Sequence, residues 1–182
     1  MQVCEKGVSI VFLVSVRFQE MADPVIGINR ITLEDIPFVL EIQRDCYGEE
    51  YIEGSRTFTR MITVYPQGCL GVSVGGILVA YVFFHPYHED VVKPLDLSLV
   101  LNGTEDCMYL HDIAVHHRYR GMSYTRMLME RVDDETRRGG FEVQCLVAVQ
   151  NSQVFWRKHG FKMVRMIESY GESPARYMKR SL

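Results

Sequence analysis

The sequence lacks a hydrophobic run long enough to cross a membrane. Its apolar stretch near the N-terminus, Val8 to Val16, is much shorter than the roughly 20 residues that a transmembrane helix needs. The stretch is also a poor signal peptide, because no strongly basic start precedes it and no small-x-small cleavage site follows it. We therefore predict a protein with no membrane partner.

A surplus of positive charge is missing as well. The chain has 20 Lys and Arg against 23 Asp and Glu, so its formal net charge at pH 7 is -3. Binding to nucleic acid favours a strong basic surplus, and we therefore expect no nucleic-acid partner. A cationic substrate suits this charge balance better.

Closely spaced cysteines are absent. The cysteines are odd in number and too scattered to give the paired spacing of a zinc site or a redox motif: Cys4, Cys46, Cys69, Cys107 and Cys145. This distribution predicts reduced thiols inside strands and helices. We therefore expect an intracellular, cytoplasmic protein without a bound metal.

The sequence shows no internal repeat, low-complexity tract or second domain boundary. With 182 residues, 47% of them hydrophobic, it can bury the core of one domain of ordinary size. We assign this domain to residues 26–182 and treat residues 1–25 as an N-terminal extension, with Met21 as an alternative translation start. The alternative is that this segment forms a strand packed on the domain or on a neighbouring chain.

The first half of the chain follows the order strand, helix, helix, hairpin. Alternating polarity predicts the first strand, and a threonine followed by an acid three residues later predicts a helix start at Thr32. Ser55 is expected to cap the second helix. A glycine pair between two apolar runs predicts a two-residue hairpin turn. The expected ranges are strand 25–31, helices 32–48 and 55–65, and strands 69–74 and 77–85.

In the second half, a strand, a helix and a strand follow one another, which makes parallel pairing of the two strands the default. Before them lies the connection 86–106, which is longer than compact domains usually tolerate without a purpose. We interpret it as an insertion on the substrate side or the partner side. A short helix capped by Asn151 or Ser152 comes later. The expected ranges are strand 107–115, helix 120–140, strand 141–149, helix 151–160, and strands 161–169 and 175–181.

The segment HHRYRGMSY, residues 116–124, lies where a strand gives way to a helix. A helix N-terminus offers free amide hydrogens and the positive end of the helix dipole, so a glycine-containing loop there can bind phosphate. Gly121 lets the backbone approach a ligand closely, and the hydroxyls of Ser123 and Thr125 can add hydrogen bonds. Taken alone, the segment is better explained as a charged turn on a solvated face, because short glycine motifs match by chance.

Two blocks together are more specific. Arg118, Gly121 and Ser123 match the motif Arg/Gln-x-x-Gly-x-Gly/Ala between a strand ending in "AV" and an amphipathic helix. A second block, an asparagine before an aromatic residue and a terminal "GF", matches Asn151, Phe155, Trp156, Gly160 and Phe161. In their order and spacing these blocks resemble the GNAT N-acetyltransferase superfamily. The resemblance covers the chain from about Ile26 to the C-terminus.

The resemblance implies a fold of the α/β (α+β) class: a mixed, mostly antiparallel sheet with splayed central parallel strands and helices on both faces. It also implies acetyl-CoA as cosubstrate, with the pantetheine arm between the splayed strands and the pyrophosphate at the loop before the helix. The residues expected to contact acetyl-CoA are Ile113, Ala114, Val115, Arg118, Arg120, Gly121, Met122, Ser123, Tyr124, Thr125, Asn151 and Trp156.

The reaction implied is transfer of the acetyl group directly to a primary amine of a small molecule or peptide, which needs a general base. His111 is our candidate, because the ordinary pKa of a histidine, about 6.5, suits proton removal near neutral pH. Residues of a strand alternate between its faces, so Asp112 points away from His111 unless a bulge intervenes. We expect Asp112 to be an internal hydrogen-bond partner or a helix-capping group. The alternative for His111 is a hydrogen-bonded core histidine.

The general acid is where the chain departs from the family pattern. Members commonly have tyrosine where this chain has Trp156, and an indole N–H cannot act as an acid at neutral pH. Tyr124 is the substitute that we assign to catalysis, with Tyr170 and Ser152 as alternatives, and Trp156 is then expected to pack against the cofactor arm. The departure also supports an alternative function: a catalytically weakened acyl-CoA-binding module with a sensing or assembly role.

Two groups of ionisable residues have competing explanations. The segment 85–90, which begins with His85, contains metal-ligand residue types, but an incomplete set in a loop is better explained by solvation. Glu49, Glu50 and Glu53 would attract an ammonium ion, although a solvated acidic loop is the commoner explanation. As partners we expect an amine substrate and, as an alternative to a monomer, a second copy of the chain.

Overall fold

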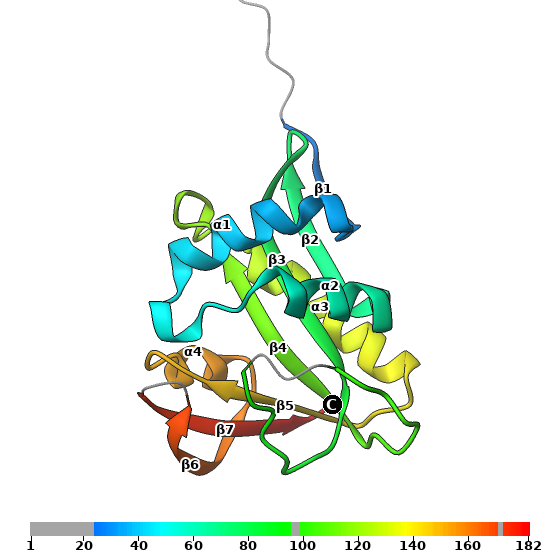
Figure 1. The fold of residues 1–182 in the computed structure, drawn as a ribbon, viewed down its shortest axis with the longest axis vertical. Helices are drawn as coiled ribbons and strands as arrows, with labels where there is room; N and C mark the ends of the chain where they lie inside the picture. The colour runs from blue at the N-terminus through cyan, green and yellow to red at the C-terminus, as the bar shows by residue number, and fades with distance from the viewer. Residues whose placement is uncertain (1–23, 96–98, 171–172) are drawn as a thin grey trace, which may run out of the picture.

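A computed structural model describes residues 24–95, 99–170 and 173–182, and within these residues seven strands form one sheet (Figure 1). The strands lie in the order β1-β2-β3-β4-β5-β7-β6, and every neighbouring pair is antiparallel except β4 and β5. Along the chain the elements are β1 (Ile26–Arg30), α1 (Ile36–Cys46), α2 (Ser55–Val64), β2 (Cys69–Val74), β3 (Ile77–Tyr87), β4 (Cys107–Val115), α3 (Tyr124–Arg138), β5 (Val143–Ala148), α4 (Gln153–Lys158), β6 (Lys162–Tyr170) and β7 (Ser173–Ser181).

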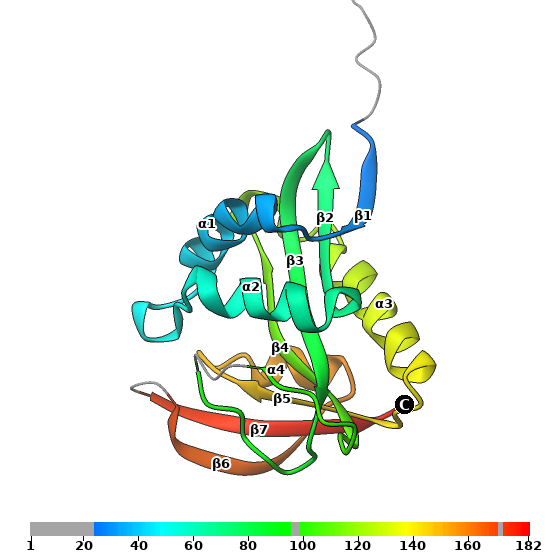
Figure 2. The same ribbon diagram turned by 45° about the vertical axis from the view of Figure 1, so that its right-hand side comes forward.

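Helices cover both faces of the sheet. α1 and α2 lie on one face, and α3 lies on the other (Figures 1 and 2). The residues that these helices bury are spaced three or four positions apart, as an amphipathic helix requires: Val39 and Ile42, Phe58 and Met61, and Leu128 and Val132. The predicted fold class is confirmed. No helix among the described residues is long and apolar enough to cross a membrane.

β4 and β5 are paired over a short distance only. Met108, Tyr109 and Leu110 of β4 lie opposite residues 144–146 of β5, and past Leu110 the pairing ends. β4 nevertheless continues to Val115, because β3 pairs with it that far. The two central parallel strands therefore diverge along the C-terminal half of β4, as the sequence predicted.

β4 contains a β-bulge at His111. Phe83 of β3 lies opposite Asp112 and the next residue, Phe84, lies opposite Leu110, so the register passes over His111. An extra residue in one strand interrupts the alternation of side chains between the two faces. His111 and Asp112 consequently line the same cavity although they are consecutive residues. Of the two arrangements that the sequence allowed, the one with a bulge is correct.

Three predicted helix starts differ from the structure. The amide of Thr32 donates to the Asp35 carboxylate, as expected, but a single 3-10 turn precedes α1. Ser55 is the first residue of α2 rather than its cap, because Gly54 takes the N-cap position in an extended conformation. α3 begins at Tyr124 rather than at residue 120, since the intervening loop contains residues with positive φ. Residues 1–23 of the predicted extension 1–25 lie outside the described residues, as does Met21.

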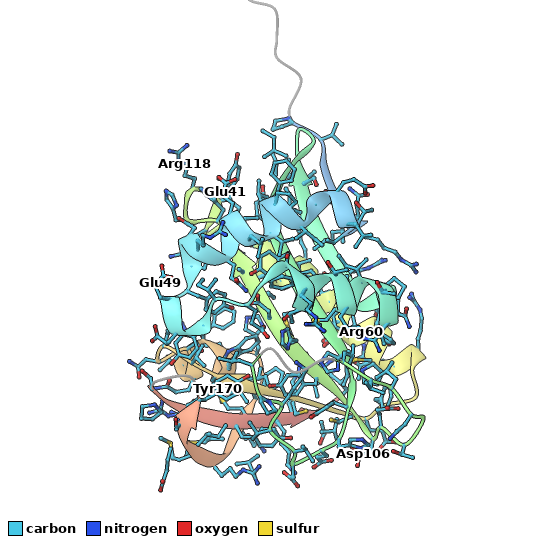
Figure 3. All side chains as sticks on the ribbon, in the orientation of Figure 1. Glu41, Glu49, Arg60, Asp106, Arg118 and Tyr170 are labelled. Atoms are coloured by element: carbon cyan, nitrogen blue, oxygen red, sulfur yellow. The ribbon has the colours of Figure 1, made fainter. Side chains whose placement is uncertain are left out.

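The connection between β3 and β4 is shorter than predicted and is packed. β3 runs to Tyr87, so the connection covers residues 88–106. A proline at position 86 is tolerated in β3 because β2 stops pairing at Phe83, which leaves β3 with a single neighbour there. Leu99 is 2% exposed, and its carbonyl accepts a hydrogen bond of 2.9 Å from Arg60 Nε of α2 (Figure 3). The connection therefore contributes to the core.

Gly68 lies between α2 and β2, where a side chain would meet backbone. A Cβ atom at this position would lie 1.9 Å from the carbonyl oxygen of Phe84. We expect Gly68→Ala to lower the free energy of unfolding by about 1–3 kcal/mol, as overpacking does. Gly27→Ala is the matched control, since its Cβ would approach no atom closer than 3.5 Å. Chemical denaturation measures both changes, and an unaltered stability of Gly68→Ala would contradict the close backbone approach.

Candidate active site

A cavity of about 470 Å³ occupies the space between the diverging strands. Its walls come from the end of α1, the linker between α1 and α2, the C-terminal half of β4, the loop before α3, β5 and α4. Segments far apart in the sequence therefore meet here. The predicted site residues that line the cavity are His111, Ile113, Ala114, Val115, Arg120, Gly121, Ser123, Tyr124, Thr125 and Trp156.

His111 and Glu53 form a buried pair in this cavity. His111 Nε2 lies 2.6 Å from Glu53 Oε2, and the two side chains are 2% and 4% exposed. An ionised carboxylate can only accept, so the hydrogen bond is donated by the Nε2–H group. In the neutral tautomer that makes this hydrogen bond, the other ring nitrogen, Nδ1, has the lone pair. The arrangement gives a histidine whose ring is oriented by a carboxylate.

Asp112 is buried beside this pair and is surrounded by hydroxyl groups. Its two carboxylate oxygens lie 2.6 Å from the hydroxyl of Tyr47 and 2.7 Å from the hydroxyl of Tyr81. Burial raises the pKa of Asp112, and donation by the two tyrosines acts in the opposite direction. Asp112 is thus the internal hydrogen-bond partner that the sequence predicted.

Gln43 connects the backbone of Glu53 to the carboxylate of Asp112. This α1 residue is 1% exposed, and its Oε1 accepts a hydrogen bond of 3.1 Å from the amide of Glu53. Its Nε2 lies 3.5 Å from an Asp112 carboxylate oxygen, which makes a long hydrogen bond. Gln43 therefore fixes the backbone of Glu53 relative to β4, and through Glu53 it fixes the ring of His111.

The edge of β4 that faces the cavity presents the backbone groups of Ile113 and Val115. Successive residues of an antiparallel strand point their amide and carbonyl groups alternately toward and away from the partner. The amide of His116 donates to a β3 carbonyl at 3.0 Å, so the groups of Ala114 also face β3. The carbonyls of Ile113 and Val115 accept hydrogen bonds from side chains outside the sheet, as this alternation requires. This edge fits the predicted position of the pantetheine arm.

The loop before α3 has two residues with positive φ, Gly121 at 81° and Ser123 at 62°. Ser123 is the N-cap of α3, a 15-residue helix whose first amides have no partner inside the helix. Gly121, Ser123 and Thr125 all line the cavity. The positive end of the α3 dipole therefore lies at the cavity, where it suits a pyrophosphate group.

The other residues predicted to contact acetyl-CoA lie in different places. Three of them belong to the loop before α3, residues 116–123, which we call the cofactor loop. Arg120 lines the cavity, and its Nε donates to the Val115 carbonyl at 3.3 Å. Arg118 is exposed and points away from the molecule at the tip of the loop (Figure 3). Met122 is 55% exposed. Neither Arg118, Met122 nor Asn151 is part of the lining of this cavity.

Three aromatic residues that the sequence singled out lie in the cavity wall. Trp156 is 7% exposed and packs edge-on against two phenylalanine rings. Tyr124 is the first residue of α3 and is 5% exposed. Tyr170 ends β6, and its hydroxyl donates to the carbonyl of Lys93 at 3.0 Å. The proton of Tyr170 is therefore engaged in a hydrogen bond, whereas Tyr124 lies next to the cofactor loop.

His85 lies in a strand, as the expected range 77–85 has it, and the interpretation of the segment 85–90 as a solvated loop is wrong at this residue. His85 lies in β3 and is fully buried, with Nδ1 2.8 Å from the Pro86 carbonyl oxygen. Burial lowers its pKa to about 3, so the ring is neutral. The acids of the same segment, Glu89 and Asp90, pair with Lys179 of β7. Within the described residues the segment 85–90 therefore does not gather into a metal-ligand set.

A family model now identifies the chain. The model of the acetyltransferase (GNAT) family matches residues 36–161, which is more than half of the sequence. The chain belongs to the GNAT acetyltransferase family. The resemblance inferred from the two sequence blocks is thereby confirmed. No curated protein sequence matches the chain.

Solved structures share this GNAT fold at low sequence identity. Ard1 from Thermoplasma volcanium is 18% identical with a TM-score of 0.72, and the match covers 86% of this chain and 97% of Ard1. Arabidopsis thaliana Naa50 in complex with the bisubstrate analogue CoA-Ac-MVNAL is 12% identical, with a TM-score of 0.67 and coverage of 86% and 99%. The GNAT-like decarboxylase GphF in complex with isobutyryl-CoA is 14% identical, with a TM-score of 0.71 and coverage of 85% and 98%. These proteins differ in chemistry, so the shared fold does not by itself give the reaction.

The positions of Glu53 beside His111 and of Gln43 beside the Glu53 backbone were not predicted from the sequence of this GNAT chain. Glu53 was grouped with Glu49 and Glu50, but Glu49 lies on the outer side of the turn, away from the cavity (Figure 3). The signal that distinguishes Glu53 is its position just after Tyr51 and an isoleucine, a short apolar stretch in an acidic linker. Gln43 carries no comparable signal, because a single glutamine in an amphipathic helix is ordinarily solvated.

Tyr81 offers a test of the hydrogen-bond network around Asp112. Tyr81→Phe removes one donor from a buried carboxylate, and we expect the free energy of unfolding at pH 7 to fall by about 1–3 kcal/mol. Tyr87→Phe is the control, since the Tyr87 hydroxyl makes no hydrogen bond within the described residues. Urea denaturation of both variants measures the difference. Equal stabilities would mean that Asp112 does not depend on the Tyr81 hydroxyl.

Proposed function

We propose that the protein is an acetyl-CoA-dependent N-acetyltransferase that acts on a primary amine of a small molecule or peptide. The observation that carries this proposal is the buried pair of His111 and Glu53, which lies in the same cavity as the exposed edge of β4 and the start of α3. A base, a strand edge for the pantetheine arm and a helix end for the pyrophosphate are the parts that the reaction needs. Naa50, in complex with an analogue that joins CoA to a peptide, supports this class of substrates.

The pair of His111 and Glu53 prepares the amine. An amine arrives mostly as an ammonium ion, and the Glu53 carboxylate favours its approach to the cavity. His111 Nδ1 takes one proton from the ammonium nitrogen, directly or through water. The imidazolium that forms is stabilised by Glu53, which already accepts the hydrogen bond from Nε2. The free amine then has the lone pair that attack requires.

The transfer itself exchanges two bonds at the acetyl carbonyl carbon. The amine nitrogen forms a bond to this carbon, the bond to the CoA sulfur breaks, and the sulfur leaves with the electron pair as a thiolate. Tyr124, buried at the first turn of α3, is our candidate to supply the proton to the thiolate. The ordered hydrogen bond of Tyr170 to Lys93 makes Tyr170 a weaker candidate. The proton that leaves the amine nitrogen after attack passes through solvent to the Tyr124 phenolate, and His111 releases its proton to solvent.

Trp156 supports a second candidate function. In this alternative the chain binds an acyl-CoA without efficient acetyl transfer and serves in sensing or assembly. The feature that favours this reading is the absence of a tyrosine at the position of Trp156, which packs as part of the cavity wall. A chain that binds acetyl-CoA but releases no free thiol with any member of a broad panel of amines and peptides would support this second function.

Acetyl-CoA should raise the melting temperature of the protein, because a ligand that binds only the folded state stabilises it. Gly121→Val is expected to abolish most of this shift, since valine rarely adopts the φ of 81° found here and would also fill the loop. Gly103→Val is the matched control, because Gly103 has a φ of 83° and lies in the connection before β4, away from the cavity. Differential scanning fluorimetry measures both. No shift of the wild-type protein at saturating acetyl-CoA would exclude both proposed functions.

His111→Ala should lower kcat by about 10²- to 10⁴-fold, the usual contribution of a general base. The dissociation constant of acetyl-CoA should stay within about twofold, because this change removes an interaction of the transition state. Glu53→Gln keeps the shape of the side chain but removes its charge, and we expect a smaller loss of kcat. His88→Ala, which changes a histidine outside the cavity, is the control. A thiol-release assay in which His111→Ala turns over like the wild type would remove His111 from the role of base.

A further inference from the structure

A cluster of metal-ligand side chains lies outside the cavity, at the outer side of the cofactor loop. Asp45 belongs to the last turn of α1, and His116 and His117 follow the end of β4. The atoms by which these three residues could hold an ion all lie within 4.8 Å of one another. The absence of a metal was predicted from the cysteines and from the segment 85–90, and neither includes this cluster. Two elements that are distant in sequence thus bring together two imidazoles and one carboxylate.

The ligand atoms of the cluster are already oriented. Asp45 accepts a hydrogen bond of 2.7 Å from the His117 amide and lies 2.5 Å from Nδ1 of the His117 ring. The His116 ring stacks on the His117 ring with centroids 4.5 Å apart. His116 Nδ1 accepts a hydrogen bond of 3.3 Å from the Arg118 amide, and coordination through this nitrogen would replace that hydrogen bond. The side chains are therefore held by backbone and ring contacts, and little ordering remains for a bound ion to supply.

The electrostatic state of Asp45 suits a cation. A carboxylate carries a negative charge at neutral pH. The Asp45 side chain is 21% exposed and the His117 side chain 54%, so an ion can reach them from solvent.

We infer that Asp45, His116 and His117 form a binding site for a divalent transition-metal ion such as Zn²⁺. Two imidazole nitrogens and one carboxylate oxygen are a ligand set that Zn²⁺ accepts, with water in the fourth position. Ligands about 2.0–2.1 Å from a tetrahedral ion lie about 3.3 Å apart, which the present spacing reaches with small side-chain rotations. The ion takes the place of the proton between Asp45 and His117, and this proton passes to solvent.

An ion at this position would join the end of α1 to the loop that leads into α3. Arg120, which lines the cavity, also contacts this end of α1, through Cys46 Sγ at 3.5 Å. The metal site and the cofactor loop therefore share their backbone. The inference itself depends on the three side chains alone, and it stands whether or not the protein transfers an acetyl group.

Isothermal titration of ZnCl₂ into the full chain, first stripped with EDTA and then freed of the chelator, tests the site. One Zn²⁺ ion should bind per chain and should persist in an excess of Mg²⁺, which prefers oxygen ligands. His117→Gln and Asp45→Asn should each weaken binding at least about tenfold, the loss that even an outer partner of a metal ligand causes. His88→Gln, a change of a histidine outside the cluster, should leave binding unaltered.

Two further measurements distinguish binding at this site from a loss of folding and from binding at a cysteine. The melting temperature without metal should be similar for His117→Gln and the wild type, and Zn²⁺ should raise it for the wild type only. Co²⁺ bound in place of Zn²⁺ should give the absorption of nitrogen and oxygen ligands without a thiolate charge-transfer band. The inference is wrong if the wild type binds no Zn²⁺, if both ligand variants bind like the wild type, or if a thiolate band assigns the ion to a cysteine.

Discussion

The site depends on one constraint of the sheet: β4 loses its partner on one side while it keeps its partner on the other. Past Leu110 the strand is paired with β3 alone, so the backbone groups of Ile113 and Val115 face the space beside β5. Backbone groups buried away from water need hydrogen-bond partners. Side chains at the end of α1 satisfy the two carbonyls, which places α1 against the cavity. The cavity and the helix that closes it therefore follow from the same divergence.

The bulge at His111 brings two ionisable side chains, His111 and Asp112, into the cavity beside the diverging strands. Regular alternation would turn His111 and Asp112 to opposite faces, whereas the extra residue lets both line the cavity. Each side chain then has its own hydrogen-bond partners: Glu53 for His111, and Tyr47 and Tyr81 for Asp112. A buried polar network of this kind costs free energy unless all of its members are satisfied. Its role is to hold the histidine in one orientation.

The parts of this site that sequence predicts are those fixed by local chemistry. β4 was placed at 107–115 with its observed bounds, because a mostly apolar segment of strand length lies there between polar segments. The Gly121 loop was located as a glycine at a strand-to-helix junction, and its expected role came from the family resemblance that the two sequence blocks carry. The end of β3 was placed at His85 instead of Tyr87 because a proline at position 86 is typical of a strand end, and only the strand pairing shows that β3 has a free side there. Glu53 was undervalued because its burial depends on contact with His111, 58 residues away in sequence.

Because Trp156 stands where a tyrosine is expected, the proposed acetyl transfer needs another way to stabilise or protonate the leaving thiolate. An indole cannot protonate a leaving thiolate, and its packing against Phe155 and Phe161 makes it a rigid wall. The demand for an acid is modest, however, because an ordinary thiol has a pKa of about 8.5 and its anion leaves readily near neutral pH. The N-terminus of α3 lies at the same cavity and favours negative charge. Catalysis is therefore compatible with a tryptophan at this position, provided that the N-terminus of α3 stabilises the CoA thiolate and Tyr124 or water protonates it.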